Sequence, residues 1–171
     1  LVFFNKREKD FPELNFLLQE VYHTTALTEA IEKVFDRKGN VKNDASPQLM
    51  VIRQSIQTVK SQINRNFDKE MRKLMKEGVL GETKETFVND RRVLTIVSTY
   101  KRKVKGSVVG SSKTGSLTYI EPQVNVELNN ELELLTDDER KEIFRILQVL
   151  TREIAQFLPL IIAYQNLLTE L

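Results

Sequence analysis

Apolar residues recur every three or four positions along a long stretch in the first half of the chain. The stretch runs from Leu49 to Leu74, and neither Gly nor Pro interrupts it before Gly78. Ser46 and Pro47 stand just ahead of it, a pair typical of a helix N-cap followed by the first helical position. The pattern predicts one helix of about 30 residues, which at roughly 1.5 Å per residue makes a rod of roughly 45 Å.

A second stretch with the same spacing runs from Ile143 to Leu171. Thr136 and the three acidic residues after it predict the start of this helix, because acidic side chains favour the positive end of the helix dipole. A shorter helix is expected ahead of it, from Gln123 to Leu134, and Pro159 predicts a kink near the far end. Two such seams in one chain predict a pair of antiparallel, coiled-coil-like helices.

A less regular helical pattern covers residues 11–35. Gly39 follows it at a position that suits the left-handed conformation beyond a helix end. His23, the one histidine of the chain, lies within this pattern with neither a cysteine nor a pair of carboxylates nearby. We therefore interpret it as a residue on a helix face rather than a metal ligand or a member of a catalytic triad, and we predict no metal site.

Between the two long helices the apolar period shortens to two, the period of a half-buried strand. Four segments alternate in this way and are separated by turn-forming residues, which predicts a small antiparallel sheet of three or four strands. The segments are residues 85–89, 92–98, 106–111 and 116–120.

The expected fold class is therefore mainly α with a small β subdomain, in which long antiparallel lever helices carry the sheet as a clamp. We expect the first lever helices in residues 1–83, the β-rich tip in 84–121 and the returning helices in 122–171. The chain opens on Leu1 instead of Met, and we interpret it as a piece of a longer protein.

Charge is distributed unevenly behind a formal net charge of +2. Residues 84–116 hold 8 Lys or Arg against 2 Asp or Glu, which is +6, whereas residues 117–171 hold 4 against 10, which is −6. A basic segment of this density is expected to meet a polyanion. The candidate nucleic-acid-binding residues are Arg91, Arg92, Lys101, Arg102, Lys103, Lys105 and Lys113.

Two alternatives bear on these cations. Lysines on the edge of a small sheet also serve to block aggregation between sheets, with no ligand involved. A further row of cations follows the first long helix and either extends the basic path or forms the solvated face of a coiled coil. That row is Lys60, Arg65, Lys69, Arg72, Lys73 and Lys76.

Two motifs that suggest catalysis have simpler interpretations. The segment 110–116 has the glycine spacing of a phosphate-binding loop, but Ser116 stands where that loop needs Lys, and a strand follows where a helix is required. We interpret it as a hairpin turn. Glu121 is expected to cap the helix that begins near Gln123; as a general acid it lacks an evident partner.

Composition excludes several classes. The chain has no cysteine, so it has no disulfide framework and no thiolate metal site, which fits a reducing cytoplasmic compartment. No apolar run approaches the roughly 20 residues that span a bilayer, so no membrane partner is expected.

A set of short motifs resembles the MutS-two branch of the bacterial MutS-like ATPases. The resemblance covers about residues 11–171, with Ile96 in place of an expected proline and Thr114 in place of a commoner serine. Its most specific part is a serine- and glycine-rich strand that ends in Glu-Pro and runs into Leu-Asn-Asn-Glu-Leu. The motifs are residues 43–49, Ile52-Arg53, residues 106–112, Gly115, Thr118, Ile120-Glu121-Pro122, residues 126–132, Glu142-Ile143, Ile146-Leu147 and Leu150-Thr151.

The resemblance implies a lever and clamp region of a dimeric ATPase that acts on branched or recombining DNA, in suppression of homologous recombination and in DNA repair. Members carry an ATPase domain, which binds ATP and Mg, and often a C-terminal Smr nuclease domain. We expect neither domain in this chain, and therefore no enzyme activity and no cofactor. Two alternatives remain open: a ribosome- or RNA-binding clamp of a ribosome-rescue relative, and a structural coiled coil that contacts protein.

Overall fold

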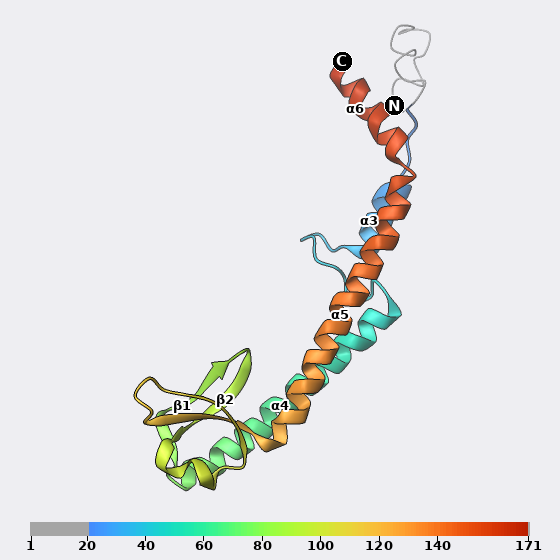
Figure 1. Cartoon of the computed structure of the whole chain (residues 1–171). Helices are drawn as coiled ribbons and strands as arrows, with labels where there is room; N and C mark the ends of the chain where they lie inside the picture. The colour runs from blue at the N-terminus through green and yellow to red at the C-terminus, as the bar shows by residue number, and fades with distance from the viewer. Residues whose placement is uncertain (1–20, 171) are drawn as a thin grey trace, which may run out of the picture. The chain divides into compact units, whose positions relative to one another are not determined.

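The structure is a computed structural model, and it describes residues 21–170 of the chain. These residues are mainly helical with one small sheet, as the sequence predicts (Figure 1). The elements in chain order are α3 (Ala26–Val34), α4 (Pro47–Lys76), β1 (Leu80–Val88), β2 (Arg91–Val97), the 3-10 helix η1 (Ser98–Lys103), β3 (Gly106–Ser111), β4 (Leu117–Pro122), α5 (Gln123–Ala155) and α6 (Leu158–Glu170).

The chain divides into two compact units. Among the described residues, the first unit takes residues 21–50 with 141–170, and the second unit takes residues 51–140. Helices α4 and α5 each contribute residues to both units. The tip predicted at residues 84–121 lies within the second unit, together with a part of each long helix.

Helix α4 begins where the sequence predicts. The Leu49 N–H donates to Ser46 Oγ at 3.0 Å, and the Met50 N–H donates to the Ser46 carbonyl at 3.1 Å. The Ser46 hydroxyl therefore satisfies one of the N–H groups that a helix start leaves without partners, and its carbonyl accepts the first helical hydrogen bond. Pro47 follows as the first helical residue. The helix ends at Lys76, and Gly78 takes a φ of 68° in the left-handed region just beyond it.

Helix α5 is one continuous helix of 33 residues, so the prediction of a short helix followed by a new start at Thr136 is wrong. The Thr136 hydroxyl donates to the Leu132 carbonyl at 2.7 Å, one turn earlier. A threonine that bonds back to the preceding turn sits inside a helix, whereas an N-cap threonine accepts from the turn that follows.

Pro159 produces a break rather than a kink. Helix α5 ends at Ala155, and Pro159 is the second residue of α6, where a missing N–H leaves no helical hydrogen bond unmade. The two helices are bent by 59° at this break. Of the helices that the structure describes, none is by itself long and apolar enough to cross a membrane, and α5 with α6 meets the length and composition criteria only as a bent pair.

The helix predicted over residues 11–35 is shorter than expected in the part that the structure describes. Helix α3 begins at Ala26, and the predicted stretch before residue 21 lies outside the described residues. Thr24 Oγ1 accepts the Ala26 N–H at 3.1 Å ahead of the helix, so His23 is an exposed non-helical residue and its predicted place on a helix face is wrong. Gly39 has the predicted left-handed conformation, with a φ of 81°.

The sheet has four antiparallel strands in the order β1-β2-β4-β3, which confirms the predicted small antiparallel sheet. A two-residue turn joins β1 to β2, and both of its residues, Asn89 and Asp90, take positive φ, as this tight hairpin requires. Strand β1 begins at Leu80, earlier than the sequence indicates, with an irregularity between Leu80 and Glu85.

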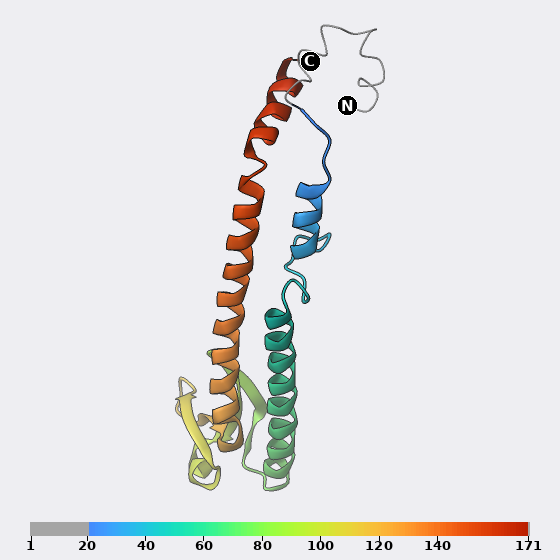
Figure 2. The ribbon, with the colours of Figure 1, turned by 90° about the vertical axis from the view of Figure 1, so that its right-hand side faces the viewer.

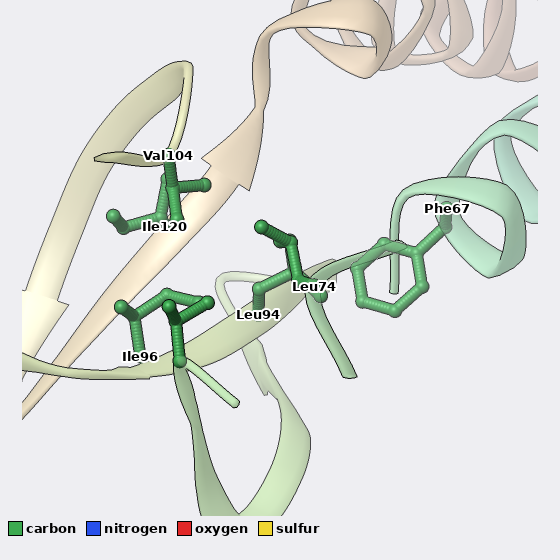
Figure 3. Close-up of a cluster of buried hydrophobic side chains, with 7 residues drawn as sticks. Phe67, Leu74, Leu94, Ile96, Val104 and Ile120 are labelled. Carbon is green, nitrogen blue, oxygen red and sulfur yellow. The ribbon is translucent and has the colours of Figure 1, made fainter. Parts of the chain in front are cut away.

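One apolar cluster holds the second unit together. It joins α4 to β2, β4 and the segment after η1, and Figure 3 shows its side chains converging from these elements. Each buried aliphatic or aromatic side chain of this kind contributes roughly 1.5–3 kcal/mol of transfer free energy. The cluster consists of Phe67, Leu74, Val79, Leu94, Ile96, Val104 and Ile120.

Within the second unit, α4 and the first part of α5 lie side by side, as Figures 1 and 2 show. The Asn125 Nδ2 donates to the Ile63 carbonyl at 3.1 Å, and Arg53 Nε lies 2.7 Å from Glu139 Oε1. The first contact is at the start of α5 and the second lies further along it, while their partners follow α4 in the reverse order. The two helices are therefore antiparallel in this unit.

Candidate nucleic-acid interface

The densest group of cations, in residues 101–105, begins on η1, whose first residue, Ser98, is fixed to the sheet. The Ser98 N–H donates to the Ser116 carbonyl at 2.9 Å, and the Ser98 hydroxyl donates to the Gly115 carbonyl at 2.7 Å. The turn between β3 and β4, which carries Lys113, is therefore held against the start of η1.

The other end of the segment is fixed by Val104 and Lys105. Val104 is buried in the apolar cluster of the second unit, and the Lys105 carbonyl accepts the Gln123 N–H at 3.1 Å. A buried side chain flanked by charged ones gives the segment a defined position and directs the charges away from the core. Residues 98–103 of this segment form a short 3-10 helix between strands β2 and β3.

The cations of this segment are exposed. Lys101, Arg102 and Lys105 have neither an ion pair nor a hydrogen bond from their side chains within residues 21–170. Lys103 lies 5.0 Å from the centre of the Tyr100 ring, a cation–π distance that still leaves its ammonium exposed. These four residues, which we call the η1 cations, are available to an external anion.

Lys113 adds one more exposed cation beside them. It lies in the turn between β3 and β4, where the Gly115 N–H donates to the Ser112 carbonyl at 2.9 Å and Gly115 has a φ of 71°. The turn returns directly into strand β4. The segment that resembles a phosphate-binding loop is therefore a hairpin turn, as its sequence predicts.

Arg91 has a different environment. Its guanidinium lies 3.1 Å from Glu121 Oε2 and 3.1 Å from Glu133 Oε2, and it donates to Asn130 Oδ1 at 2.9 Å. Burial works to lower the pKa of Arg91, but the hydrogen bonds and charges of Glu121 and Glu133 outweigh it, so the pKa is raised. We leave Arg91 out of the interface because its donors are already occupied.

Arg92 is occupied as well. Its guanidinium lies 2.9 Å from Asp68 Oδ1 and 2.6 Å from Glu85 Oε2, with its centre 4.2 Å from the centre of the Phe67 ring. These contacts tie the β1–β2 hairpin to α4. The seven predicted cations therefore separate into an exposed group of five and a paired group of two.

Glu121 explains part of this separation. Its side chain is only 2% exposed, and its Oε1 accepts from Asn129 Nδ2 at 2.6 Å in addition to the ion pair with Arg91. It holds the end of β4 to α5 through Asn129 and to β2 through Arg91, so its predicted role as a helix cap is wrong. Over the described residues, no group of three or more His, Cys, Asp or Glu side chains is arranged to hold a metal ion.

Comparison with known proteins points to one family. No family model matches the chain. Proteins named Endonuclease MutS2 do match it, at 35% identity over 91% of this chain in Lactococcus lactis subsp. cremoris strain MG1363, 31% over 84% in Aquifex aeolicus strain VF5, and 29% over 98% in Geobacillus sp. strain WCH70. The matched regions make up 20%, 19% and 21% of those relatives.

The long helices, the small sheet and these matches together define a MutS-like protein. Within that class, the chain belongs to the MutS2 branch. It spans about a fifth of the length of the curated relatives it matches.

Proposed function

We propose that this chain is the DNA-binding clamp and lever segment of a MutS2-type protein, and that the η1 cations hold the sugar–phosphate backbone. One observation carries the proposal: within one basic stretch of sequence, the arginines of β2 are paired with carboxylates while the η1 cations and Lys113 are exposed. Cations that only balanced internal charge would resemble the first group.

The chemistry of the exposed group suits backbone recognition. Lysine and arginine that neutralise phosphates release condensed counterions, and this supplies affinity without reading the base sequence. The turn beside η1 adds the hydroxyls of Ser112, Thr114 and Ser116, which bond to one another at 2.8 to 3.3 Å and also suit phosphate oxygens. We therefore propose binding that depends on DNA shape and charge.

The lever part of the proposal rests on α4 and α5, of 30 and 33 residues. We propose that they pack as a coiled-coil-like pair and transmit ATP-driven motion from a homodimeric, cytoplasmic ATPase to the DNA contact. ATP and Mg would bind in that ATPase, and any cleavage implied by the relatives' name would belong to parts of the longer protein that this chain does not match. Branched DNA in recombination is the proposed substrate.

The test replaces the η1 cations together, as Lys101→Ala, Arg102→Ala, Lys103→Ala and Lys105→Ala. A matched control replaces four exposed cations of the first unit, as Lys33→Ala, Arg37→Ala, Lys38→Ala and Arg152→Ala, which changes the net charge equally. Binding to a four-way junction, a duplex and ribosomes is measured at one salt concentration. We expect the η1 variant to lose about tenfold or more in DNA affinity and the control to lose much less.

Three results would contradict the proposal. Equal losses in both variants would mean that net charge alone attracts DNA. Unchanged DNA affinity in the η1 variant, with loss of ribosome binding, would favour the ribosomal role, and no change with any partner would favour a structural segment.

A further inference from the structure

Helix α4 has an unusual charge distribution for a long, exposed helix. From Pro47 to Phe67 it contains no Asp or Glu, and its first acidic residue is Asp68. The same stretch contains three cations, and one of them, Arg53, is paired with Glu139. Lys60 and Arg65 remain exposed, so this part of the helix has a positive surface with no acidic residue of its own.

A shallow groove runs along this part of α4, with a volume of about 630 Å³. Its lining residues are spaced by three and four positions, so they share one face of the helix, while the buried Val59 and Ile63 lie on the other face. The lining residues are Gln57, Thr58, Ser61, Asn64 and Arg65.

Every lining side chain can donate a hydrogen bond, and none is acidic or apolar. Arg65 is exposed and has no side-chain partner among the described residues. Asn64 accepts from Arg92 Nη1 at 3.4 Å through its Oδ1, which leaves its two N–H groups for another acceptor. Arginine with serine, threonine, asparagine and glutamine is the set of side chains that contacts phosphate and sugar oxygens.

The groove is a poor fit for a protein partner. Protein interfaces are anchored by apolar or aromatic side chains in desolvated pockets, and the lining offers none. A single guanidinium among uncharged donors suits an extended ligand with one charge per repeat. From Gln57 to Arg65 the groove extends for about 12 Å, the axial length of three or four base pairs.

We infer that this face of α4 is a second contact surface for the nucleic-acid backbone, with Arg65 as its ionic contact and the uncharged side chains as hydrogen-bond donors. The inference rests on the proposed function, because it extends the same ligand beyond the η1 cations. Arg92, which bonds to Asn64, links the β1–β2 hairpin to one end of the groove.

The experiment compares three variants of the same chain in duplex binding over a range of salt. Arg65→Glu reverses the charge in the groove. Lys60→Glu is the matched control, since Lys60 is an exposed cation on the same helix that does not line the groove. Gln57→Ala with Ser61→Ala removes hydrogen bonds without a change in charge and suits the helix, because alanine is the best helix former.

We expect Arg65→Glu to weaken binding about tenfold and to lower the magnitude of the salt slope by about 1, as loss of one phosphate contact requires. Lys60→Glu should change affinity about threefold or less. The double alanine variant should weaken binding a few-fold at an unchanged salt slope. If the charge reversal unfolds the helix, duplex binding of Arg65→Ala is measured in place of that of Arg65→Glu.

The outcomes separate this inference from the proposed function. Equal effects of Arg65→Glu and Lys60→Glu on duplex binding, or no effect of either, would overturn the proposed backbone contact at the groove. The proposed function would still stand if the η1 variant bound DNA more weakly. Loss of binding in Arg65→Glu with full binding in the η1 variant would support the groove and overturn the η1 contact.

Discussion

At the scale of single residues, Gly106 shows how closely the small sheet is packed. It begins β3 opposite Pro122, and a Cβ at this position would collide with the Glu121 carbonyl oxygen and meet the Ile120 side chain at 2.7 Å. The backbone of β4 cannot move aside without disturbing the buried Glu121. A glycine is therefore required here for space and not for its φ.

Gly106→Ala should lower the free energy of unfolding by about 1–3 kcal/mol, the usual cost of forcing extra atoms into a packed site. Gly110→Ala is the control in the same strand, because its Cβ would only touch Tyr119 at 3.4 Å. Chemical denaturation of both variants measures the difference. Equal stabilities would mean that the two strands separate more easily than their packing indicates.

Arg91 and Glu121 form the ion pair that joins β2 and β4 to α5. Glu121 is 2% exposed and the Arg91 side chain is 28% exposed, so loss of the guanidinium leaves a buried carboxylate without its counter-ion. Arg91→Ala should lower the free energy of unfolding by about 3–5 kcal/mol. Arg140→Ala, whose guanidinium is 76% exposed in its pair with Asp137, should cost at most about 1 kcal/mol.

Denaturant unfolding distinguishes these two arginines directly. A cost for Arg91→Ala no larger than that for Arg140→Ala would show that Arg91 is not a structural residue. It would then return to the set of possible DNA contacts.

The charge pattern predicts Lys101, Arg102, Lys103, Lys105 and Lys113, which are exposed, but it does not separate Arg91 and Arg92 from them. Arg91 is paired with residues that lie 30 or more positions away in the sequence. Arg92 is held by the packing of β2 against α4. No local pattern encodes either contact. Glu121 was misassigned for the same reason, because its place just ahead of a helix suggests a cap while its long-range partner decides its role.

At the scale of elements, the start of α4 is joined to α5 by a buried carboxylate. Ser46 Oγ donates to Glu142 Oε1 at 2.6 Å while it also caps α4, and Arg145 Nη2 donates to the same oxygen at 2.6 Å. The hydrogen bonds from Arg145 and Ser46 lower the pKa of Glu142 to about 2, from an ordinary value of 4.5.

This shift predicts a pH dependence of stability. A carboxyl whose pKa is lower in the folded state stabilises the fold above pH 4.5, and that stabilisation is lost as the pH falls toward 2. The wild-type protein should therefore exceed Glu142→Gln in free energy of unfolding at pH 7, and the gap should narrow below pH 4.5. Urea unfolding at pH 7, 5, 4 and 3 measures it. A gap that stays constant over this range would contradict the shifted pKa.

Element boundaries were predictable where local signals agree with packing. Ser46 and Pro47 stand ahead of an unbroken apolar seam, and α4 begins there as expected. At Thr136 the local signal misled, because a threonine followed by acids resembles a cap even inside a helix. The buried Asn125 and Asn129, which bond to α4 and to Glu121, already hold α5 in place well before Thr136.

At the scale of the whole molecule, the distribution of charge was the most informative property of the sequence. The +6 of residues 84–116 marks the stretch that carries the exposed cations. The structure adds the buried Val104, which positions them, and the ion pairs that remove two of the seven. The division into two units follows from long-range contacts and was not evident from the apolar pattern.

The salt dependence of duplex binding tests most directly whether the η1 cations touch phosphates. Each phosphate contact contributes about 0.9 to the slope of log Kobs against log salt concentration, so removal of all four should lower the magnitude of the slope by about 3 to 4. The wild-type chain and the Lys101→Ala, Arg102→Ala, Lys103→Ala, Lys105→Ala variant would be titrated with the same duplex. Equal slopes for the two proteins would contradict the account.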